Sequence, residues 1–79
     1  MKLINIGFGN YVSDIRIVAV MNPDSAPVKR VIAGAKQNGL AIDATYGRHC
    51  KTAILTDSNH VVLSSLSPEV VESRINTAE

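Results

Sequence analysis

The stretch that decides the fold is KTAILTDSNHVVLSSL, residues 51–66 of a 79-residue chain. Its two halves, KTAILTD (51–57) and VVLSSL (61–66), are rich in β-branched and aliphatic residues, which is typical of strands. Between them stands a run of residues that favour turns, DSNH (57–60). The stretch therefore predicts two strands that a tight turn connects.

Three more strands are predicted before this stretch, over residues 2–6, 15–21 and 40–45. The first is followed by GFGN (7–10), which we interpret as a tight turn with Phe8 tucked beneath it. The third leads into Tyr46-Gly47, which we expect to form a hairpin tip before the strand at 51–57.

Two helices complete the pattern. The first follows Asp24 or Ser25 as its cap and ends at Asn38-Gly39, because a glycine there can take the left-handed conformation. The second begins at Ser67-Pro68-Glu69, with serine as cap and proline at the first helical position. The order is ββ-α-βββ-α, which favours an α+β fold of about five mostly antiparallel strands and two helices. We expect one domain, residues 1–79.

The small size of the chain predicts assembly. A domain of this length buries only about 60% of the surface of its unfolded chain, and its single cysteine can form no internal disulfide. About five strands with two helices also leave some sheet edges uncovered, and such edges invite pairing with another copy. The sequence therefore predicts a homo-oligomer.

Composition excludes several classes of protein. No apolar run approaches the roughly 20 residues that span a bilayer, and the N-terminus lacks the pattern of a secretory signal. We therefore expect a cytoplasmic protein with a reduced thiol, no membrane partner, no small-molecule substrate and no cofactor. The net charge is only +1, so binding to a polyanion would require basic residues gathered by placement or by assembly.

Reactive and basic side chains gather in IDATYGRHCKT, residues 42–52. Cys50 beside His49 suggests a catalytic pair, but neighbours on a strand point to opposite faces, so we expect no enzyme. One cysteine and two histidines without a recognisable ligand spacing do not predict a metal site. A redox-responsive thiol stays open, because Arg48 and Lys51 would lower the pKa of Cys50.

Anion binding is the remaining interpretation of these side chains. Arg48 and Lys51 flank the expected hairpin tip, and Arg16 stands at the start of a strand. Lys29 and Arg30 lie together on the first helix. The planar fork of donors on arginine suits phosphate, but scattered surface cations are common and do not by themselves predict a nucleic-acid partner.

The chain as a whole resembles a known family. INIGFGN (4–10), DSAPVKR (24–30), IDATYGR (42–48) and DSNHVVLSSLSPE (57–69) are similar, in order and spacing, to the bacterial RemA family of extracellular matrix regulatory proteins. The resemblance runs from about Leu3 to Arg74.

This resemblance implies a small DNA-binding transcriptional regulator, nucleoid-associated, of genes for biofilm matrix and osmoprotection. It also implies a ring of identical subunits, for which we take an octamer as the first expectation, with arginines that meet DNA somewhat as a histone core does. Arg16 and Arg48 match basic positions of the family and are expected to contact DNA. Lys51, His49, Lys29 and Arg30 are the further candidates.

The sequence departs from the family pattern after Arg48. The family usually continues with a second arginine, a threonine and another basic residue, whereas this chain has His49-Cys50-Lys51. An ordinary histidine is mostly neutral at pH 7, so the departure weakens the expected charge. Two alternatives follow: a ring-forming scaffold or interaction module with weakened DNA binding, and a thiol or metal sensor that uses Cys50 with His49 or His60.

Overall fold

Two buried strands joined by a tight turn form the centre of the protein, as residues 51–66 predict. In the computed structural model, which describes residues 1–77, β5 (Thr52–Thr56) pairs antiparallel with β6 (Val61–Ser64). Asn59 in the connecting turn has a φ of 66°, a left-handed conformation that asparagine tolerates better than most residues. Every residue of β6 is buried, so this strand must be covered on both faces of the sheet.

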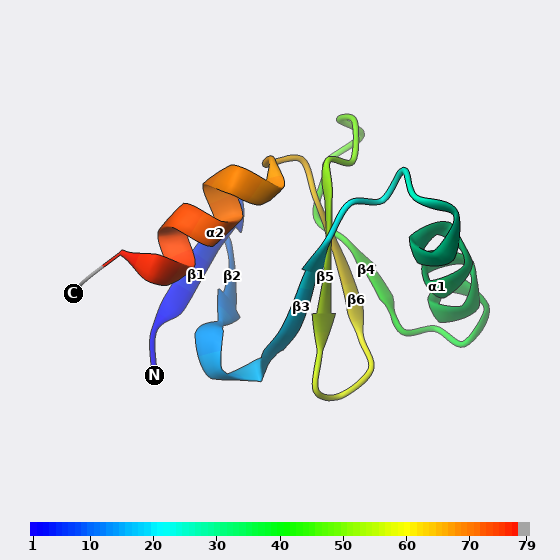
Figure 1. The fold of residues 1–79 in the computed structure, drawn as a ribbon, viewed down its shortest axis with the longest axis horizontal. Helices are drawn as coiled ribbons and strands as arrows, with labels where there is room; N and C mark the ends of the chain where they lie inside the picture. The colour runs from blue at the N-terminus through cyan, green and yellow to red at the C-terminus, as the bar shows by residue number, and fades with distance from the viewer. Residues whose placement is uncertain (78–79) are drawn as a thin grey trace.

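Two further strands extend the hairpin into a four-stranded sheet. Its order is β3-β5-β6-β4, with β3 (Ile17–Met21) antiparallel to β5 and β4 (Ala41–Asp43) parallel to β6. The connection between the two edge strands contains α1 (Ala26–Gln37), which lies against one face of the sheet (Figure 1).

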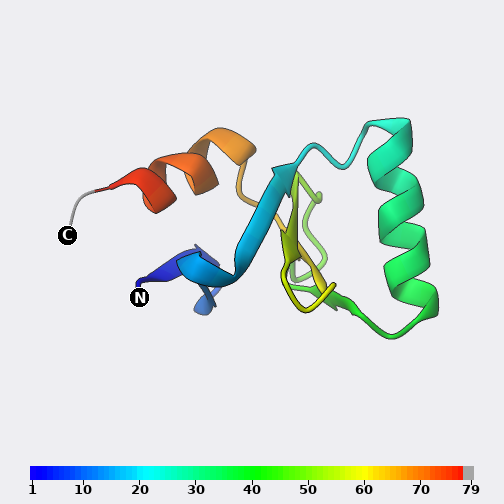
Figure 2. The ribbon, with the colours of Figure 1, turned by 60° about the horizontal axis from the view of Figure 1, so that its bottom comes forward.

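The N-terminal hairpin and the C-terminal helix cover the opposite face. The hairpin consists of β1 (Leu3–Gly7) and β2 (Asn10–Ser13), and a 3-10 turn, Asp14–Arg16, leads from it into β3. The helix is α2 (Pro68–Asn76). Figure 2 shows these elements on one side of the four-stranded sheet and α1 on the other.

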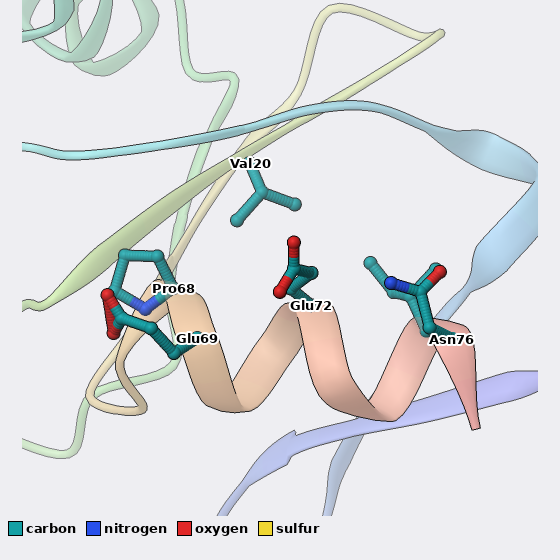
Figure 3. A pocket seen from close by; sticks show the side chains of 6 residues that line it. Val20, Pro68, Glu69, Glu72 and Asn76 are labelled. Carbon is teal, nitrogen blue, oxygen red and sulfur yellow. The ribbon is translucent and has the colours of Figure 1, made fainter.

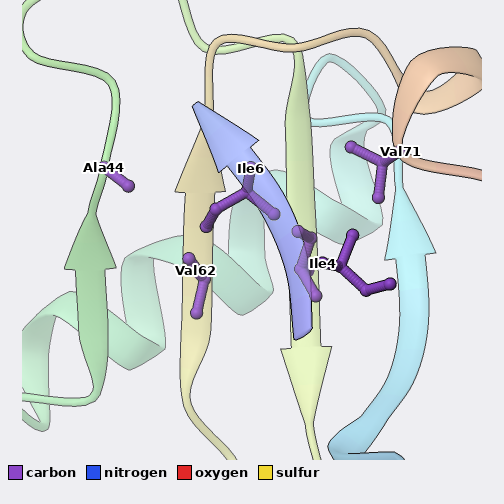
Figure 4. Close-up of a cluster of buried hydrophobic side chains, with 6 residues drawn as sticks. Ile4, Ile6, Ala44, Val62 and Val71 are labelled. Carbon is purple, nitrogen blue, oxygen red and sulfur yellow. The ribbon is translucent and has the colours of Figure 1, made fainter. Parts of the chain in front are cut away.

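The sheet separates two hydrophobic clusters. On the side of the hairpin and α2, Ile4 and Ile6 of β1 pack with Ile54, Val62, Ala44 and Val71 (Figure 4). On the side of α1, Ala35 packs with Ala53, Val61 and Leu63. Because side chains alternate along a strand, β5 and β6 supply both clusters, and this explains why their sequences are almost continuously apolar.

The predicted α+β class is confirmed, with six strands rather than about five. The additional strand, β2 (Asn10–Ser13), contains only two strand-forming residues, Tyr11 and Val12, which is too short a run to predict a strand by itself, and pairing with β1 stabilises it. The strand predicted over 15–21 begins at Ile17, because Asp14–Arg16 forms the 3-10 turn. Both helices begin and end close to the predicted positions, and the hydroxyl of Ser67 accepts a hydrogen bond from the backbone N–H of Val70 at 3.3 Å.

The prediction of a hairpin around Tyr46-Gly47 was wrong. β4 and β5 are not neighbours, because β6 lies between them in the sheet. The segment from Ala44 to Lys51 is therefore a loop that crosses the end of β6. Turn residues between two strand-like segments are compatible with either arrangement, and only the pairing of β4 with β6 distinguishes them.

One buried hydroxyl connects the two layers of strands. The hydroxyl of Ser64, at the end of β6, donates a hydrogen bond to the carbonyl of Ile6 at 2.7 Å and accepts one from the N–H of Leu66 at 3.1 Å. Ser64 has no exposed surface, so water cannot replace either bond.

Replacing Ser64 with alanine should lower the free energy of unfolding by about 1–3 kcal/mol, because a buried carbonyl loses its donor. Urea or thermal denaturation would measure the loss. Ser73→Ala, at an exposed position of α2, is the matched control and should change stability by less than about 0.5 kcal/mol. Equal effects of the two substitutions would contradict the role of the Ser64 hydroxyl.

Candidate functional site

The loop from Ala44 to Lys51, the Arg48 loop, is fixed at both ends by the last residues of β6. The N–H of Ala44 donates to the carbonyl of Leu63, and the N–H of Lys51 donates to the carbonyl of Ser64, each at 2.9 Å. Backbone atoms therefore define the path of the loop, and its side chains project from the end of the sheet.

A carboxylate organises the beginning of the loop. One carboxylate oxygen of Asp43 accepts hydrogen bonds from the hydroxyl of Thr45 at 2.6 Å and from its N–H at 2.9 Å. These two bonds hold the pKa of the Asp43 carboxyl below its usual value. The N–H of Arg48 then donates to the carbonyl of Thr45 at 3.0 Å, which closes the turn that contains Tyr46-Gly47.

The turn between β1 and β2 lies against this loop. Gly7, Phe8 and Gly9 all have positive φ, of 109°, 55° and 76°, and the Phe8 ring stacks on the ring of Tyr46 with centroids 4.9 Å apart. Phe8 is 47% exposed, so the expectation that it is tucked beneath its own turn was wrong. The ring leaves the turn because it packs on a side chain of the neighbouring loop.

Arg48 lies over the Phe8 ring of this stacked pair. Its guanidinium carbon is 5.8 Å from the centroid of the ring, within the range of a cation–π interaction. A shallow hollow of about 290 Å³, the basic hollow, is lined by Phe8, Arg48, His49, Lys51 and Ser65. Its lining contains two cations, a histidine and a hydroxyl but no carboxylate, which is a suitable surface for an anion.

Arg16 lies at the other end of the sheet. Its Nε donates to the carboxylate of Asp57 at 2.7 Å, and its carbonyl accepts from the Asp57 N–H at 2.9 Å. Asp57 follows β5 whereas Arg48 precedes it, so the two arginines lie toward opposite ends of this five-residue strand, which is about 16 Å long at roughly 3.3 Å for each residue. Arg16 and Arg48 of one chain therefore form two separate basic positions.

The helical candidates form a third position. Lys29 and Arg30 are exposed on α1, and neither lines the basic hollow. The fold therefore places the six predicted residues in three separate regions of the surface. Of these six, only Arg48, His49 and Lys51 line the same hollow.

Cys50 is half-buried beside the hollow rather than displayed in it. Its thiol donates a weak hydrogen bond to the carbonyl of Thr52 at 3.5 Å, and burial raises the pKa of the thiol above its ordinary value. The expectation that Arg48 and Lys51 lower this pKa was wrong, because loss of hydration is the largest influence, the Asp43 carboxylate adds to it, and the cation that lowers the pKa is Lys36 of α1. Within residues 1–77, no group of three or more histidine, cysteine or acidic side chains is arranged to hold a metal ion.

A second hollow has the opposite character. It lies between α2 and β3, encloses about 320 Å³ and is lined by Glu69 and Glu72 together with Val20, Pro68, Ile75 and Asn76 (Figure 3). Two carboxylates without a lining cation make this surface unfavourable for a polyanion. The face near α2 and the face near Arg48 therefore differ in charge although the whole chain is nearly neutral.

Sequence reasoning missed the contribution of the aromatic residues. Phe8 and Tyr46 stand in GFG and TYG, so each is followed by a glycine in a predicted turn. This shared pattern signals two tight turns, but it contains no information on their stacking, which depends on the packing of β1 across the sheet.

Comparison with known proteins shows which family the chain belongs to. Residues 3–75 match the family described as extracellular matrix regulatory protein A-like, or RemA-like. The chain belongs to the RemA-like family. The resemblance noted from its sequence segments is thereby confirmed over nearly the whole chain.

Relatives in several bacteria are identical to this RemA-like protein at more than half of the aligned positions. A protein of Acetivibrio thermocellus is 56% identical over 79 residues, which cover all of this chain and 85% of the relative. One from Alkaliphilus metalliredigens is 54% identical with the same coverage, and one from Clostridium perfringens strain 13 is 56% identical, with 89% of the relative covered. All three are provisionally named regulatory proteins.

In the part of the chain that the structure describes, neither α1 nor α2 has the length and apolar character needed to cross a bilayer.

The raised pKa of Cys50 predicts that its thiol reacts slowly with alkylating reagents. A thiol with a raised pKa has less thiolate than an ordinary cysteine at pH 7–8, and the thiolate is the nucleophile. Alkylation of the folded protein by iodoacetamide should therefore be slower than that of glutathione in this range, and its rate should continue to rise at a pH where an ordinary thiol has levelled off. Alkylation in urea supplies the control, and faster reaction of the folded protein would contradict this assignment.

Proposed function

We propose that this RemA-like protein is a DNA-binding transcriptional regulator whose Arg48 loop contacts the phosphate backbone. The observation that carries the proposal is the basic hollow, where Arg48, His49 and Lys51 surround one concave surface without a carboxylate. Among the described residues the one ion pair is that of Arg16 with Asp57, so Arg48 and Lys51 are available to an external anion.

Arg16 supplies a second phosphate contact in this proposal. Arg16 forms an ion pair with Asp57, and both side chains are about half exposed, at 57% and 48%. An exposed pair of this kind contributes about 0–1 kcal/mol to stability, so the guanidinium can turn to a phosphate at little cost. Lys29 and Arg30 on α1 are weaker candidates, because helix surfaces commonly display such cations.

Assembly is the second part of the proposal. A net charge of +1 gives one chain a weak overall field, and its basic positions are separated. A ring of identical subunits, with eight as the first expectation, would repeat each contact, and linked contacts multiply affinity when they engage together. Phosphate contacts position a protein without reading sequence, so the choice of biofilm-matrix or osmoprotection genes would depend on contacts with base edges or on the shape of the DNA.

A scaffold or interaction module is the second candidate function. The near-neutral charge and the histidine at position 49, in place of a second arginine, favour it. A fluorescence-anisotropy titration of duplex DNA at several salt concentrations, with light scattering on the same samples, separates the two functions. A regulator should oligomerise and bind DNA with a salt-dependent affinity, whereas a scaffold should oligomerise without binding.

Replacing Arg48 with alanine should weaken DNA binding and reduce the slope of log affinity against log salt by about 0.9 for each phosphate that the variant no longer neutralises. Arg16→Ala should act in the same direction and leave the melting temperature nearly unchanged. Lys36→Ala removes the same charge from an exposed position of α1 and is the control. If Arg16→Ala disrupts the oligomer or lowers melting markedly, Arg16 is structural instead.

Restoring the family residue at position 49 should strengthen binding. His49 is exposed and lines the hollow, so His49→Arg adds a permanent charge and a second guanidinium where an anion would bind. The affinity should rise, and the salt slope should steepen by about 0.9 if one more phosphate is neutralised. His49→Gln is the neutral control. An unchanged slope in His49→Arg would place residue 49 outside the DNA-binding surface.

A further inference from the structure

The stacked pair of Phe8 and Tyr46 has no role in the phosphate contacts described so far. The two rings come from turns far apart in the sequence, lie 4.9 Å apart and are inclined by 25°. Phe8 is 47% and Tyr46 is 73% exposed, so neither ring is mainly a core residue. Burial in the hydrophobic core therefore does not explain why two aromatic residues stand at these positions beside a cation.

Both rings are held at backbone conformations that aromatic residues seldom adopt. Phe8 has a φ of 55° and Tyr46 a φ of 52°, in the left-handed region, where a side chain costs about 1 kcal/mol or more. Glycine or asparagine would fit either turn with less strain. Local folding alone therefore does not explain the presence of two aromatic side chains at these positions.

We infer that Phe8 is a positioning residue for Arg48: its ring, braced from the other loop by Tyr46, holds the guanidinium in place for phosphate contact. This inference rests on the proposed function. It assigns to the β1–β2 turn a part in binding although the turn itself contains no cation.

The geometry supports this role. The guanidinium carbon of Arg48 is 5.8 Å from the Phe8 centroid, and both residues line the basic hollow with Lys51 and Ser65. A free arginine side chain samples many rotamers and loses that freedom on binding. A ring that attracts the cation restricts it beforehand, and restriction before binding reduces the entropic cost of association.

The turn that carries Phe8 is itself fixed to the scaffold. The carbonyl of Ile6 accepts the buried hydroxyl of Ser64, and the N–H of Gly7 donates to the side chain of Asn5 at 2.9 Å. The amide of Asn10 donates to the carbonyl of Gly7 at 3.1 Å. These hydrogen bonds do not involve the Phe8 side chain. Removing the ring therefore need not displace the turn.

Phe8→Asn is the decisive variant. Asparagine tolerates the left-handed conformation, so relief of backbone strain offsets part of the packing lost with the half-buried ring, and the variant should remain folded while it lacks the ring. It should weaken binding to duplex DNA about two- to fivefold, the range that removal of an exposed cation–π interaction implies. Phe8→Tyr retains a ring and should restore wild-type affinity. Tyr11→Thr removes an exposed ring from the same hairpin and should leave the affinity unchanged.

A double-mutant cycle shows whether Phe8 acts through Arg48. If it does, Phe8→Asn should have no further effect on affinity in an Arg48→Ala background, whereas independent contacts would add their effects. Additive losses would overturn the inference, because Phe8 would then contact DNA or stabilise the fold by itself.

A spectroscopic measurement tests the interaction without DNA. In the wild type, the side-chain protons of Arg48 should be shifted upfield by the Phe8 ring, and the shift should disappear in Phe8→Asn. Comparison with the spectrum of Arg48→Lys assigns the signals. Absence of the shift in the folded wild type would overturn the inference even if every variant unfolds.

The outcomes distinguish this inference from the proposed function. If the wild type binds duplex DNA and Phe8→Asn binds equally well, the positioning role alone is wrong. If the oligomeric wild type fails to bind DNA at low salt, the proposed function is wrong and the positioning role is rejected with it.

Discussion

The end of β6 is the point on which the candidate site depends. Two consecutive carbonyls, of Leu63 and Ser64, accept the N–H groups at the two ends of the Arg48 loop, while the Ser64 hydroxyl binds the carbonyl of Ile6 before the Phe8 turn. β6 is entirely buried, and buried backbone groups require partners. The need to satisfy these groups brings together two segments that are distant in the sequence, and the basic hollow forms where they meet.

Two hollows on this small chain differ in charge. The hollow beside Arg48 contains no carboxylate, whereas the hollow beside α2 is lined by Glu69 and Glu72. A net charge of +1 therefore does not mean that every part of the surface is neutral. Local charge determines what each surface can bind, and the net charge governs mainly the long-range field.

Every strand except β2, both helices and the α+β class could be predicted from the sequence because periodicity and turn residues act locally. The parallel pairing of β4 with β6 could not, since the same segments are compatible with a hairpin. The cations of the site were identified individually, but Arg16 and Arg48 are placed at opposite ends of β5 by the sheet order. The stacking of Phe8 on Tyr46 and the raised pKa of Cys50 depend on tertiary packing, which no local pattern encodes.

The anchoring of the Arg48 loop through main-chain atoms also affects how the protein can diversify. Since carbonyls and N–H groups hold the ends of the loop, the exposed side chains at positions 48 and 49 contribute little to its path. Substitutions there can alter the partner surface while the scaffold is retained, as loops mounted on rigid sheets commonly allow. Replacing His49 would be a change of this kind, because it would alter the exposed surface of the loop without removing a hydrogen bond that fixes the ends of the loop.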